Sequence, residues 1–483
     1  MTLALNRVRA VDAGRMHADQ DAAGANDRGF DVAGFQDLGP AEPIEDDCLH
    51  VPCPWRVRAC CGAGAISILY RRPNGPLLGF PTKGLAVFET LKPLPPDAIL
   101  GIMTLFRADP HPGKIDLSVG VYQDEQGRTP VLASVKRAEK AILEKQESKT
   151  YVAIAGNAGF NRGIEELLYG KDHPALKGGR IATVQTPGGS GGLSIAGHLV
   201  ARARPNAKIY VSDPTWPNHQ PLLKVAGMQL DTYPYYDYAK HRVDFDPMLA
   251  RLEKASAGEL VLIHGCCHNP CGADLKREQW EALTQLCERR GLVPFIDIAY
   301  QGLAEGLDED AFGVRLMAQR LPEVVVVTSS SKNLGLYRER VGAASFVSAN
   351  AEAAKMTAAN AANVARGIYS MPPDHGAAIA AHILNDPALR AQWSQELTEM
   401  RTRLNGLRKL LVDKLAARNT PMDFSFVAKE RGLFSFLGIT KEQVIRLREE
   451  FHVYMVESSR VNIAGINHGN VDRVADSIAA VLK

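Results

Sequence analysis

The chain contains 483 residues, of which 46% are hydrophobic and 23% are charged, and its formal net charge is +2. This length allows two or more domains, and so small a net charge disfavours nucleic acid or an anionic membrane as the main partner. No apolar run approaches the roughly 20 residues that a membrane-spanning helix needs. The eight cysteines and an N-terminus without a secretory signal favour free thiols in a reducing environment, so we expect a cytoplasmic protein.

Residues 1–86 differ in composition from the rest of the chain. Their helical and strand periodicity is weak, arginine is frequent, and Lys83 is the only lysine. We expect either a disordered or poorly packed extension, or upstream sequence that was included because the start codon was assigned too early. The four cysteines of this segment do not show the paired spacing of a zinc site, so we predict no metal here.

The segment that follows supplies two candidate ligand contacts. A helix is predicted at 95–106, followed by an apolar run at 114–122 that contains Gly120. A glycine in such a run indicates either a close approach of the backbone to a ligand or a plain strand glycine. After a helical pattern at 130–145 comes Tyr151, an isolated tyrosine that is usually a packing residue.

A strand predicted at 181–187 leads directly into a glycine-rich run, Gly188-Gly189-Ser190-Gly191-Gly192, and then into a helix at 193–202. Free backbone N–H groups and the positive end of a helix dipole suit a phosphate group. The spacing is not that of the dinucleotide fingerprint. A glycine-rich turn without a ligand remains the alternative.

Two further strands end in runs of unusual composition. The strand at 207–212 ends in Asp213-Pro214-Thr215-Trp216-Pro217-Asn218-His219, where Trp216 is placed to stack on a flat ring or to fill the core. The strand at 259–263 ends in His264-Gly265-Cys266-Cys267-His268-Asn269-Pro270-Cys271-Gly272. Adjacent Cys266, Cys267 and His268 cannot easily converge on one tetrahedral ion, so we predict no metal here either.

The last two strands of this region place a carboxylate and an amine at their ends. Asp297 ends the strand at 292–296, where it suits a protonated pyridine nitrogen or caps the next helix. Four valines at 324–327 indicate a strand buried on both faces, and Lys332 follows it. A lysine at this edge lies where open α/β sheets bind ligands, and a partly desolvated amine can form a Schiff base. A surface lysine in an ordinary turn is the alternative.

In this order the motifs resemble the class I aminotransferases that use pyridoxal 5'-phosphate (PLP), and are most similar to the aspartate and aromatic-amino-acid enzymes. The resemblance covers roughly 88–483, and the run 264–272 departs from the family only at Cys271, where threonine is usual. It implies the α/β fold type I of PLP-dependent transferases, with a mostly parallel seven-stranded sheet in a large domain at 131–399. A smaller α/β domain would combine 87–130 with 400–483, and the alternation of strands and helices agrees with this fold.

The resemblance also implies a role for each site residue. The catalytic residues would be Lys332, which would carry PLP as a Schiff base, and Asp297, Tyr300 and Trp216. The cofactor would also be held by Tyr151, Gly189, Ser190, Asn269, Ser329 and Arg340. The substrate would contact Gly120, Trp216, Asn269, Arg366 and Arg460, with no metal ion. Tyr151 and Arg366 would reach in from the neighbouring subunit of a homodimer.

The implied reaction is transamination between an amino acid and 2-oxoglutarate or oxaloacetate. Arg366 favours aspartate and glutamate, whereas Ser190 and the run 211–216 are more similar to the aromatic enzymes, so we expect both substrate classes. A strict aspartate aminotransferase, a PLP-dependent decarboxylase or lyase, and a PLP-fold ligand sensor are alternatives. Arg366 and Arg460 would hold both carboxylates, which favours transamination, and residues 1–86 show no DNA-binding motif of the kind a sensor needs. Met371 replaces the usual asparagine or serine.

Overall fold

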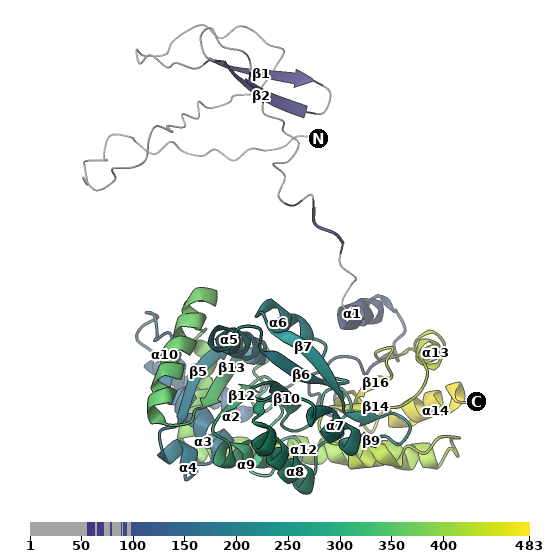
Figure 1. Ribbon diagram of the computed structural model, residues 1–483. Helices are drawn as coiled ribbons and strands as arrows, with labels where there is room; N and C mark the ends of the chain where they lie inside the picture. Colours follow the sequence, from purple (N-terminus) through teal and green to yellow (C-terminus); the bar gives the residue numbers. More distant parts are fainter. Residues whose placement is uncertain (1–55, 63–64, 72–77, 80–87, 89, 94–97) are drawn as a thin grey trace. The chain divides into compact units, whose positions relative to one another are not determined.

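The computed structural model describes residues 56–62, 65–71, 78–79, 88, 90–93 and 98–483 (Figure 1). The chain divides into two units, Met1–Leu94 and Pro95–Lys483. In the first unit, β1 (Arg56–Gly62), β2 (Ala65–Arg71) and β3 (Leu78–Gly79) form an antiparallel sheet. Most of the segment expected to be a disordered or wrongly started extension lies outside the described residues, so that expectation stays a prediction.

The second unit is built on a seven-stranded sheet with the order β5-β13-β12-β11-β10-β6-β7. Only β13 runs antiparallel to its neighbours, and the other adjacent strands are parallel. The prediction of a mostly parallel seven-stranded sheet is therefore confirmed. The strands are β5 (Ile181–Pro187), β6 (Lys208–Asp213), β7 (Gln229–Pro234), β10 (Leu260–His264), β11 (Val293–Ile298), β12 (Val324–Ser329) and β13 (Val341–Val347).

Both faces of this sheet are covered, which explains why the four valines of β12 are consecutive. Successive side chains of a strand point to opposite faces. Val324 and Val326 lie in one hydrophobic cluster, whereas Val325 and Val327 lie in the cluster on the other face. A strand with two buried faces gains from an apolar residue at every position, so the run does not alternate.

Different helices cover the two faces (Figure 1). The face of Val325 packs against α5 (Gly188–Ala203), α6 (His219–Val225) and α10 (Ala351–Ile368). The face of Val324 packs against a second group of helices, namely α2 (Ala133–Lys145), α3 (Ala158–Tyr169), α7 (Phe245–Leu252), α8 (Arg277–Arg290), α9 (Phe312–Arg320), α11 (His375–Asn385) and the first half of α12 (Pro387–Ala416).

A separate hydrophobic cluster joins an early segment of the second unit to the C-terminus. Ile115 and Leu117 pack with Leu407 and Leu411 of α12 and with Val474 of α14. The strand pair between β4 and β15 adds backbone hydrogen bonds to this contact. The elements of this region are α1 (Ala98–Ala108), β4 (Ile115–Asp116), β14 (Phe434–Phe436), α13 (Lys441–Phe451), β15 (Val453–Tyr454), β16 (Arg460–Asn462) and α14 (Val471–Val481). Such packing is what a small domain assembled from two distant chain segments requires.

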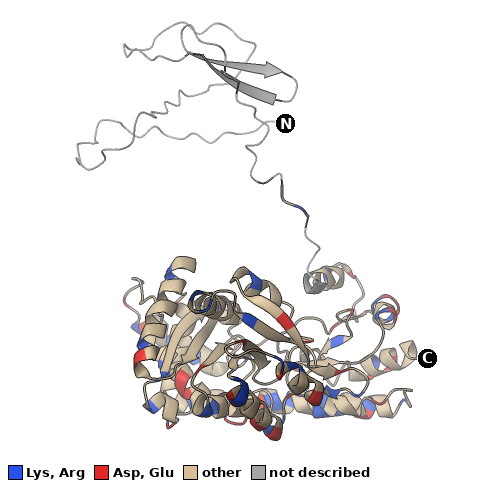
Figure 2. Cartoon of the chain, viewed as in Figure 1, with Lys and Arg blue, Asp and Glu red and all other residues tan. Residues whose placement is uncertain are grey.

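The remaining elements of the second unit are short, namely α4 (Pro174–Lys177), β8 (Tyr236–Asp237), β9 (Arg242–Val243) and the 3-10 helices η2 (Ser425–Lys429) and η3 (Ile463–Gly465). Figure 2 shows acidic and basic residues interspersed along the outer helices of this unit. Some of them form ion pairs one helical turn apart, such as Lys409 with Asp413 at 2.6 Å. Within the described part of the chain, no helix is long and apolar enough to cross a membrane.

The long helix α12 contributes to both clusters and also contacts the loop that follows β12. Its residues Leu397 and Leu404 lie in the sheet cluster, whereas Leu411 lies in the C-terminal cluster. Trp393 is completely buried, and its indole Nε1 donates a 2.7 Å hydrogen bond to the carbonyl oxygen of Asn333. The helix therefore fixes the backbone immediately after Lys332.

We predict that Trp393→Phe lowers the free energy of unfolding by about 2 kcal/mol, because it leaves the buried Asn333 carbonyl without this donor and removes ring volume. Chemical denaturation of the intact protein measures the change. Trp280→Phe is the control, because Trp280 is also buried but packs against Gly313, away from the loop. The role of α12 in fixing this backbone is wrong if Trp393→Phe changes neither the free energy of unfolding nor the rate at which Lys332 is acylated.

Candidate active site

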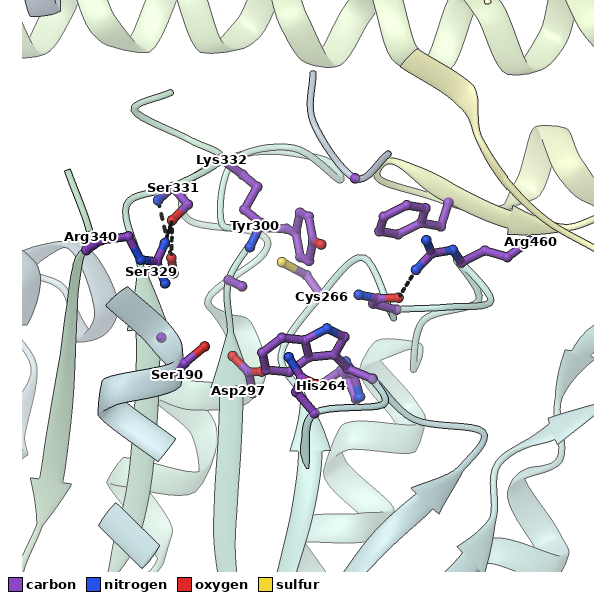
Figure 3. A pocket seen from close by; sticks show the side chains of 17 residues that line it. Ser190, His264, Cys266, Asp297, Tyr300, Ser329, Ser331, Lys332, Arg340 and Arg460 are labelled. Carbon is purple, nitrogen blue, oxygen red and sulfur yellow. Dashed lines mark hydrogen bonds between the residues drawn. The ribbon is translucent and has the colours of Figure 1, made fainter. Parts of the chain in front are cut away.

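A cavity of about 360 Å³ lies where β10, β11 and β12 end and α5 begins. Figure 3 shows that side chains from distant segments point into it. Most of the predicted site residues line this cavity, namely Gly120, Gly189, Ser190, Trp216, Asn269, Asp297, Tyr300, Ser329, Lys332, Arg340 and Arg460. The structure adds lining residues to which the sequence did not assign a role, namely Asn218, His264, Cys266, Ala299, Ser331 and Phe434.

Lys332 provides the reactive amine of the cavity. It follows β12 in a turn, and its Nζ lies 5.1 Å from the ring centroid of Tyr300. Burial lowers the pKa of Lys332 and the charge of Arg340 lowers it too, although the charge of Asp297 acts in the opposite direction. The net shift is downward, so a larger fraction of this amine is neutral and nucleophilic than in an exposed lysine.

Asp297 is the first member of a hydrogen-bonded chain that runs through His219 and Thr215 to His264. Its Oδ2 accepts a 3.0 Å hydrogen bond from His219 Nε2. Thr215 Oγ1 lies 2.7 Å from His219 Nδ1 and 3.2 Å from His264 Nε2. One proton arrangement satisfies all three bonds, in which each imidazole donates from Nε2 and the threonine hydroxyl donates to His219.

This chain keeps a buried carboxylate ionised. Burial raises the pKa of Asp297, but the hydrogen bond donated by His219 and the nearby positive charge of Lys332 oppose this effect, and the net pKa is lowered. Burial also lowers the pKa of His264 to about 3, so this imidazole is neutral. Asp297 is therefore a negatively charged acceptor in a nearly dry site.

His219 and His264 have structural partners that sequence reasoning did not assign. His219 ends the run 213–219 and His264 begins the run 264–272, so each adjoins the end of a parallel strand. Their position at strand ends was the available signal. The pairing with Asp297 was not visible, because β6 and β11 are separated in the sheet by β10.

One corner of the cavity is suited to an anion. Gly188 has a φ of +70°, and a Cβ there would lie 2.6 Å from an Arg340 guanidinium nitrogen. Ser190 lies in the first turn of α5, whose backbone N–H groups have no helical partners. Ser329 Oγ donates to Ser331 Oγ at 3.0 Å, and Arg340 Nη1 lies 3.5 Å from the same Ser331 oxygen. A helix N-terminus, hydroxyls and a guanidinium together match a phosphate group.

The opposite corner is built around Arg460. This side chain is only 5% exposed, and its Nη2 donates to the carbonyl oxygen of Ser118 at 3.0 Å. Its Nη1 donates to Asn269 Oδ1 at 3.4 Å, and the guanidinium carbon lies 4.3 Å from the ring centroid of Phe434. A Cβ at Gly120 would lie 2.8 Å from the Phe434 ring, so a larger residue there would displace that ring. A buried, oriented guanidinium is suited to fork onto a carboxylate.

The two residues that depart from the family pattern lie outside the cavity lining. Cys271 is completely buried, and its Sγ lies 3.1 Å from His268 Nδ1. Burial raises its pKa well above the ordinary value, so Cys271 is a neutral thiol in the place of the threonine hydroxyl. Among the described residues, no group of cysteine, histidine or acidic side chains is arranged to hold a metal ion. Met371 is partly buried in the loop that follows α10.

Tyr151 and Arg366 are the predicted site residues that do not line this cavity. Tyr151 is 89% exposed in the loop between α2 and α3. Arg366 is exposed near the end of α10, where it lines a different surface hollow with His198 and Arg202. Their assignment to the site of a neighbouring subunit stays a prediction.

Three comparisons with known proteins agree with one another. Residues 112–478 match the family model described as aminotransferase class I and II. The chain is 48% identical to the aspartate aminotransferase of Escherichia coli K12 over 396 residues, which cover 82% of this chain and all of that protein. It is 45% identical to the aromatic-amino-acid aminotransferase of Pseudomonas aeruginosa over 394 residues, which cover 82% of this chain and 98% of that protein.

A solved structure shows the same relationship. The aromatic-amino-acid aminotransferase of Burkholderia pseudomallei, crystallised covalently bound to pyridoxal phosphate, superimposes with a TM-score of 0.81 at 44% identity. The match covers 83% of this chain and all of that chain. A cytoplasmic aspartate aminotransferase from Saccharomyces cerevisiae has a TM-score of 0.80 at 35% identity, over 82% of this chain and 98% of that one.

The charges around Lys332 predict opposite effects of two substitutions on its pKa. Asp297→Asn should lower the pKa of Lys332 further, because it removes the negative charge that favours the protonated amine. Arg340→Gln should raise it, because it removes a like charge. The pH dependence of Lys332 acylation in cofactor-free protein, followed by peptide mass spectrometry, measures both. Shifts of the same sign in both variants would contradict this electrostatic account.

Proposed function

Because the chain belongs to the aminotransferase class I and II family, we propose that it is a PLP-dependent aminotransferase acting on both dicarboxylic and aromatic amino acids. The acceptor would be 2-oxoglutarate or oxaloacetate. The observation that carries this proposal is one cavity that combines a buried amine of lowered pKa, an ionised carboxylate, an anion corner and a buried guanidinium. Arg460 and Arg366 would together hold both carboxylates of a dicarboxylic substrate, so we favour transamination over a PLP-dependent decarboxylase or lyase.

The lining residues fit the chemical groups of PLP. Ser190, Ser329 and Arg340, with the first turn of α5, would hold its phosphate. Asp297 would pair with its pyridine nitrogen, and Lys332 would bind its aldehyde carbon. When bound, the cofactor supplies a ring that accepts the electron pair released from the amino acid Cα. Trp216 would cover the ring face, and Asn269 and Tyr300 would face its phenolic oxygen.

We assign the proton transfers to Lys332. With the amino acid bound, the Nζ of Lys332 would accept the proton from the substrate Cα and would donate it again on the side of the cofactor. The lowered pKa suits this role, because the amine must be neutral when it accepts the proton. Asp297, whose pKa is lowered, would hold a proton on the pyridine nitrogen.

The substrate would be held at both of its ends. Arg460 would bind the α-carboxylate, beside Asn269, Trp216 and Gly120. We propose that the chain forms a homodimer in which Arg366 of one subunit reaches the distal carboxylate of a substrate in the other. Tyr151 would reach the cofactor phosphate across the same interface. The exposure of both side chains in the single chain supports this arrangement.

We propose both substrate classes because relatives of either name are almost equally similar to this chain. The E. coli K12 protein bears the name of an aspartate enzyme and the P. aeruginosa protein that of an aromatic enzyme. Ser190, which is more similar to the aromatic enzymes, lies at the anion corner of this cavity. A strict aspartate aminotransferase is the second candidate, since Arg366 alone favours dicarboxylic substrates.

The domain organisation and the cellular location are proposed on similar grounds. We propose a large domain at 131–399 and a small domain that combines 87–130 with 400–483, which the separate cluster around Leu117 and Leu411 supports. We propose a cytoplasmic location, supported by free cysteines at 266, 267, 271 and 287 that the structure leaves unpaired. Residues 1–86 would be a disordered extension or the result of a wrongly assigned start.

The first test concerns the amine. Lys332→Ala should lower kcat by at least about a hundredfold, because the general base is lost. The purified parent protein incubated with PLP should be visibly coloured, and borohydride reduction followed by peptide mapping should label Lys332. Lys114→Ala is the control, because Lys114 donates to the carbonyl oxygens of Phe106 and Asp109 and lies outside the cavity. A colourless parent and an unchanged Lys332→Ala turnover would refute the assignment.

The second test concerns the donor range. Arg366→Ala should lower kcat/KM for aspartate by about ten- to a hundredfold, because a charge-assisted hydrogen bond is lost, and should change it little for phenylalanine. Arg202→Ala is the matched control, because Arg202 lines the same hollow and donates to Asn363 at 2.9 Å. Absence of turnover with tyrosine and phenylalanine in the parent protein would leave the strict aspartate enzyme.

A further inference from the structure

Gln185 connects two loops through the oxygen and the nitrogen of its terminal amide. It lies on β5 and is completely buried. Its Oε1 accepts a 2.8 Å hydrogen bond from the backbone N of Asn157, and its Nε2 donates a 2.7 Å hydrogen bond to the carbonyl oxygen of Pro373. The terminal amide offers an acceptor and a donor, and each is bonded to a different loop.

The first of these loops, residues 146–157, carries Tyr151. Its end is fixed to β5 by a second bond, in which the backbone N of Gln185 donates to the carbonyl oxygen of Ala155 at 2.9 Å. Gly156 has a φ of +86°, and a Cβ there would lie 2.3 Å from the Cβ of Gln185. The loop therefore approaches Gln185 more closely than any residue with a side chain would allow at this position.

The second loop, residues 369–374, follows the helix that carries Arg366. Tyr369 donates its hydroxyl to the carbonyl oxygen of Gln185 at 3.2 Å. The two loops also contact each other, since Asn157 Nδ2 donates to Asp374 Oδ1 at 3.2 Å. The helix that carries Arg366, α10, packs against β5, the strand that carries Gln185 (Figure 1).

From these contacts we propose that Gln185 is a positioning residue, which sets the placement of Tyr151 and Arg366 in the active site of the partner subunit. This inference rests on the proposed homodimer. The same strand continues through Pro187 into the anion corner of its own subunit. Gln185 thus lies between the cavity of its own subunit and the two loops that serve the other cavity.

The first experiment replaces the amide and leaves the size of the side chain similar. Gln185→Met should raise KM for aspartate by about tenfold and leave kcat nearly unchanged, because binding is lost equally in the ground and transition states. KM for phenylalanine should stay within about twofold, since its side chain has no carboxylate for Arg366 to bind. PLP should dissociate faster, because Tyr151 is displaced too.

The matched control is Thr183→Val on the same strand. Thr183 loses a 2.8 Å hydrogen bond to Ser345 Oγ in this variant, and its side chain contacts neither loop. Equal KM effects in Thr183→Val and Gln185→Met, or an equal loss of kcat with both donors, would overturn the proposal. If Gln185→Met does not fold, Gln185→Leu takes its place, because it also removes the side-chain bonds to Asn157 and Pro373. A raised KM for aspartate is expected, and an unchanged KM would overturn the proposal.

Hybrid dimers separate an effect on the partner from an effect within the subunit. In the first hybrid, one subunit carries Lys332→Ala and the other carries Gln185→Met. The site with the intact Lys332 is then completed by unaltered loops from the Lys332→Ala subunit, and the parent KM for aspartate is expected. In the second hybrid, one subunit carries both substitutions and the other none. The site with the intact Lys332 is then completed by the altered loops of the doubly substituted subunit, and the raised KM for aspartate is expected. Equal KM values in the two hybrids would overturn the proposal.

The same two hybrids made with Arg366→Ala in place of Gln185→Met show which premise is at fault. If Arg366→Ala raises KM only in the second hybrid but Gln185→Met does not, the dimer proposal holds and the role of Gln185 is wrong. If Arg366→Ala gives equal values in both hybrids, the shared active site itself is refuted.

Discussion

The buried pairing of Asp297 with His219 is the interaction on which the rest of the site depends. A carboxylate out of water is costly unless hydrogen bonds and opposite charges compensate for the lost hydration. The chain of Asp297, His219, Thr215 and His264 provides that compensation through one carboxylate oxygen, Oδ2. A negative charge fixed there also moderates the pKa of Lys332, which links the two reactive groups.

The sheet brings these groups together because its central strands are parallel and adjacent. β10, β11 and β12 end at the same edge, and His264, Asp297 and Lys332 lie at or just beyond their ends. The small region supplies the opposite wall with Arg460 and Phe434. α12 packs in the clusters of both regions, so a change in their relative position would act on both corners of the cavity.

The proposed homodimer would give the fold a second requirement. Tyr151 and Arg366 do not line the cavity of their own subunit, yet the loop that carries Tyr151 and the loop that follows the helix of Arg366 are both bonded to β5 beside the anion corner. In such a dimer, a loop that contacts the ligand of the other subunit would not be ordered by the ligand of its own subunit. Its placement has to come from contacts within its own subunit, and the buried amide of Gln185 makes such contacts with both loops.

The motifs predicted the α/β fold and most of the lining residues, because catalytic groups of an open parallel sheet sit beside strand ends and are therefore next to recognisable apolar runs. Ser190, Asp297 and Lys332 were found in this way.

Residues whose role comes from partners far along the chain were not found. His219 acts through Asp297, Phe434 through Arg460, and Gln185 through loops on either side of it. A local pattern records which residue follows a strand, whereas the order β5-β13-β12-β11-β10-β6-β7 and the contacts across it arise only when distant segments pack. The amino-acid order thus determined which reactive side chains this protein has. Packing determined which buried groups orient those side chains, because hydrogen bonds between distant residues have no signature in the local sequence.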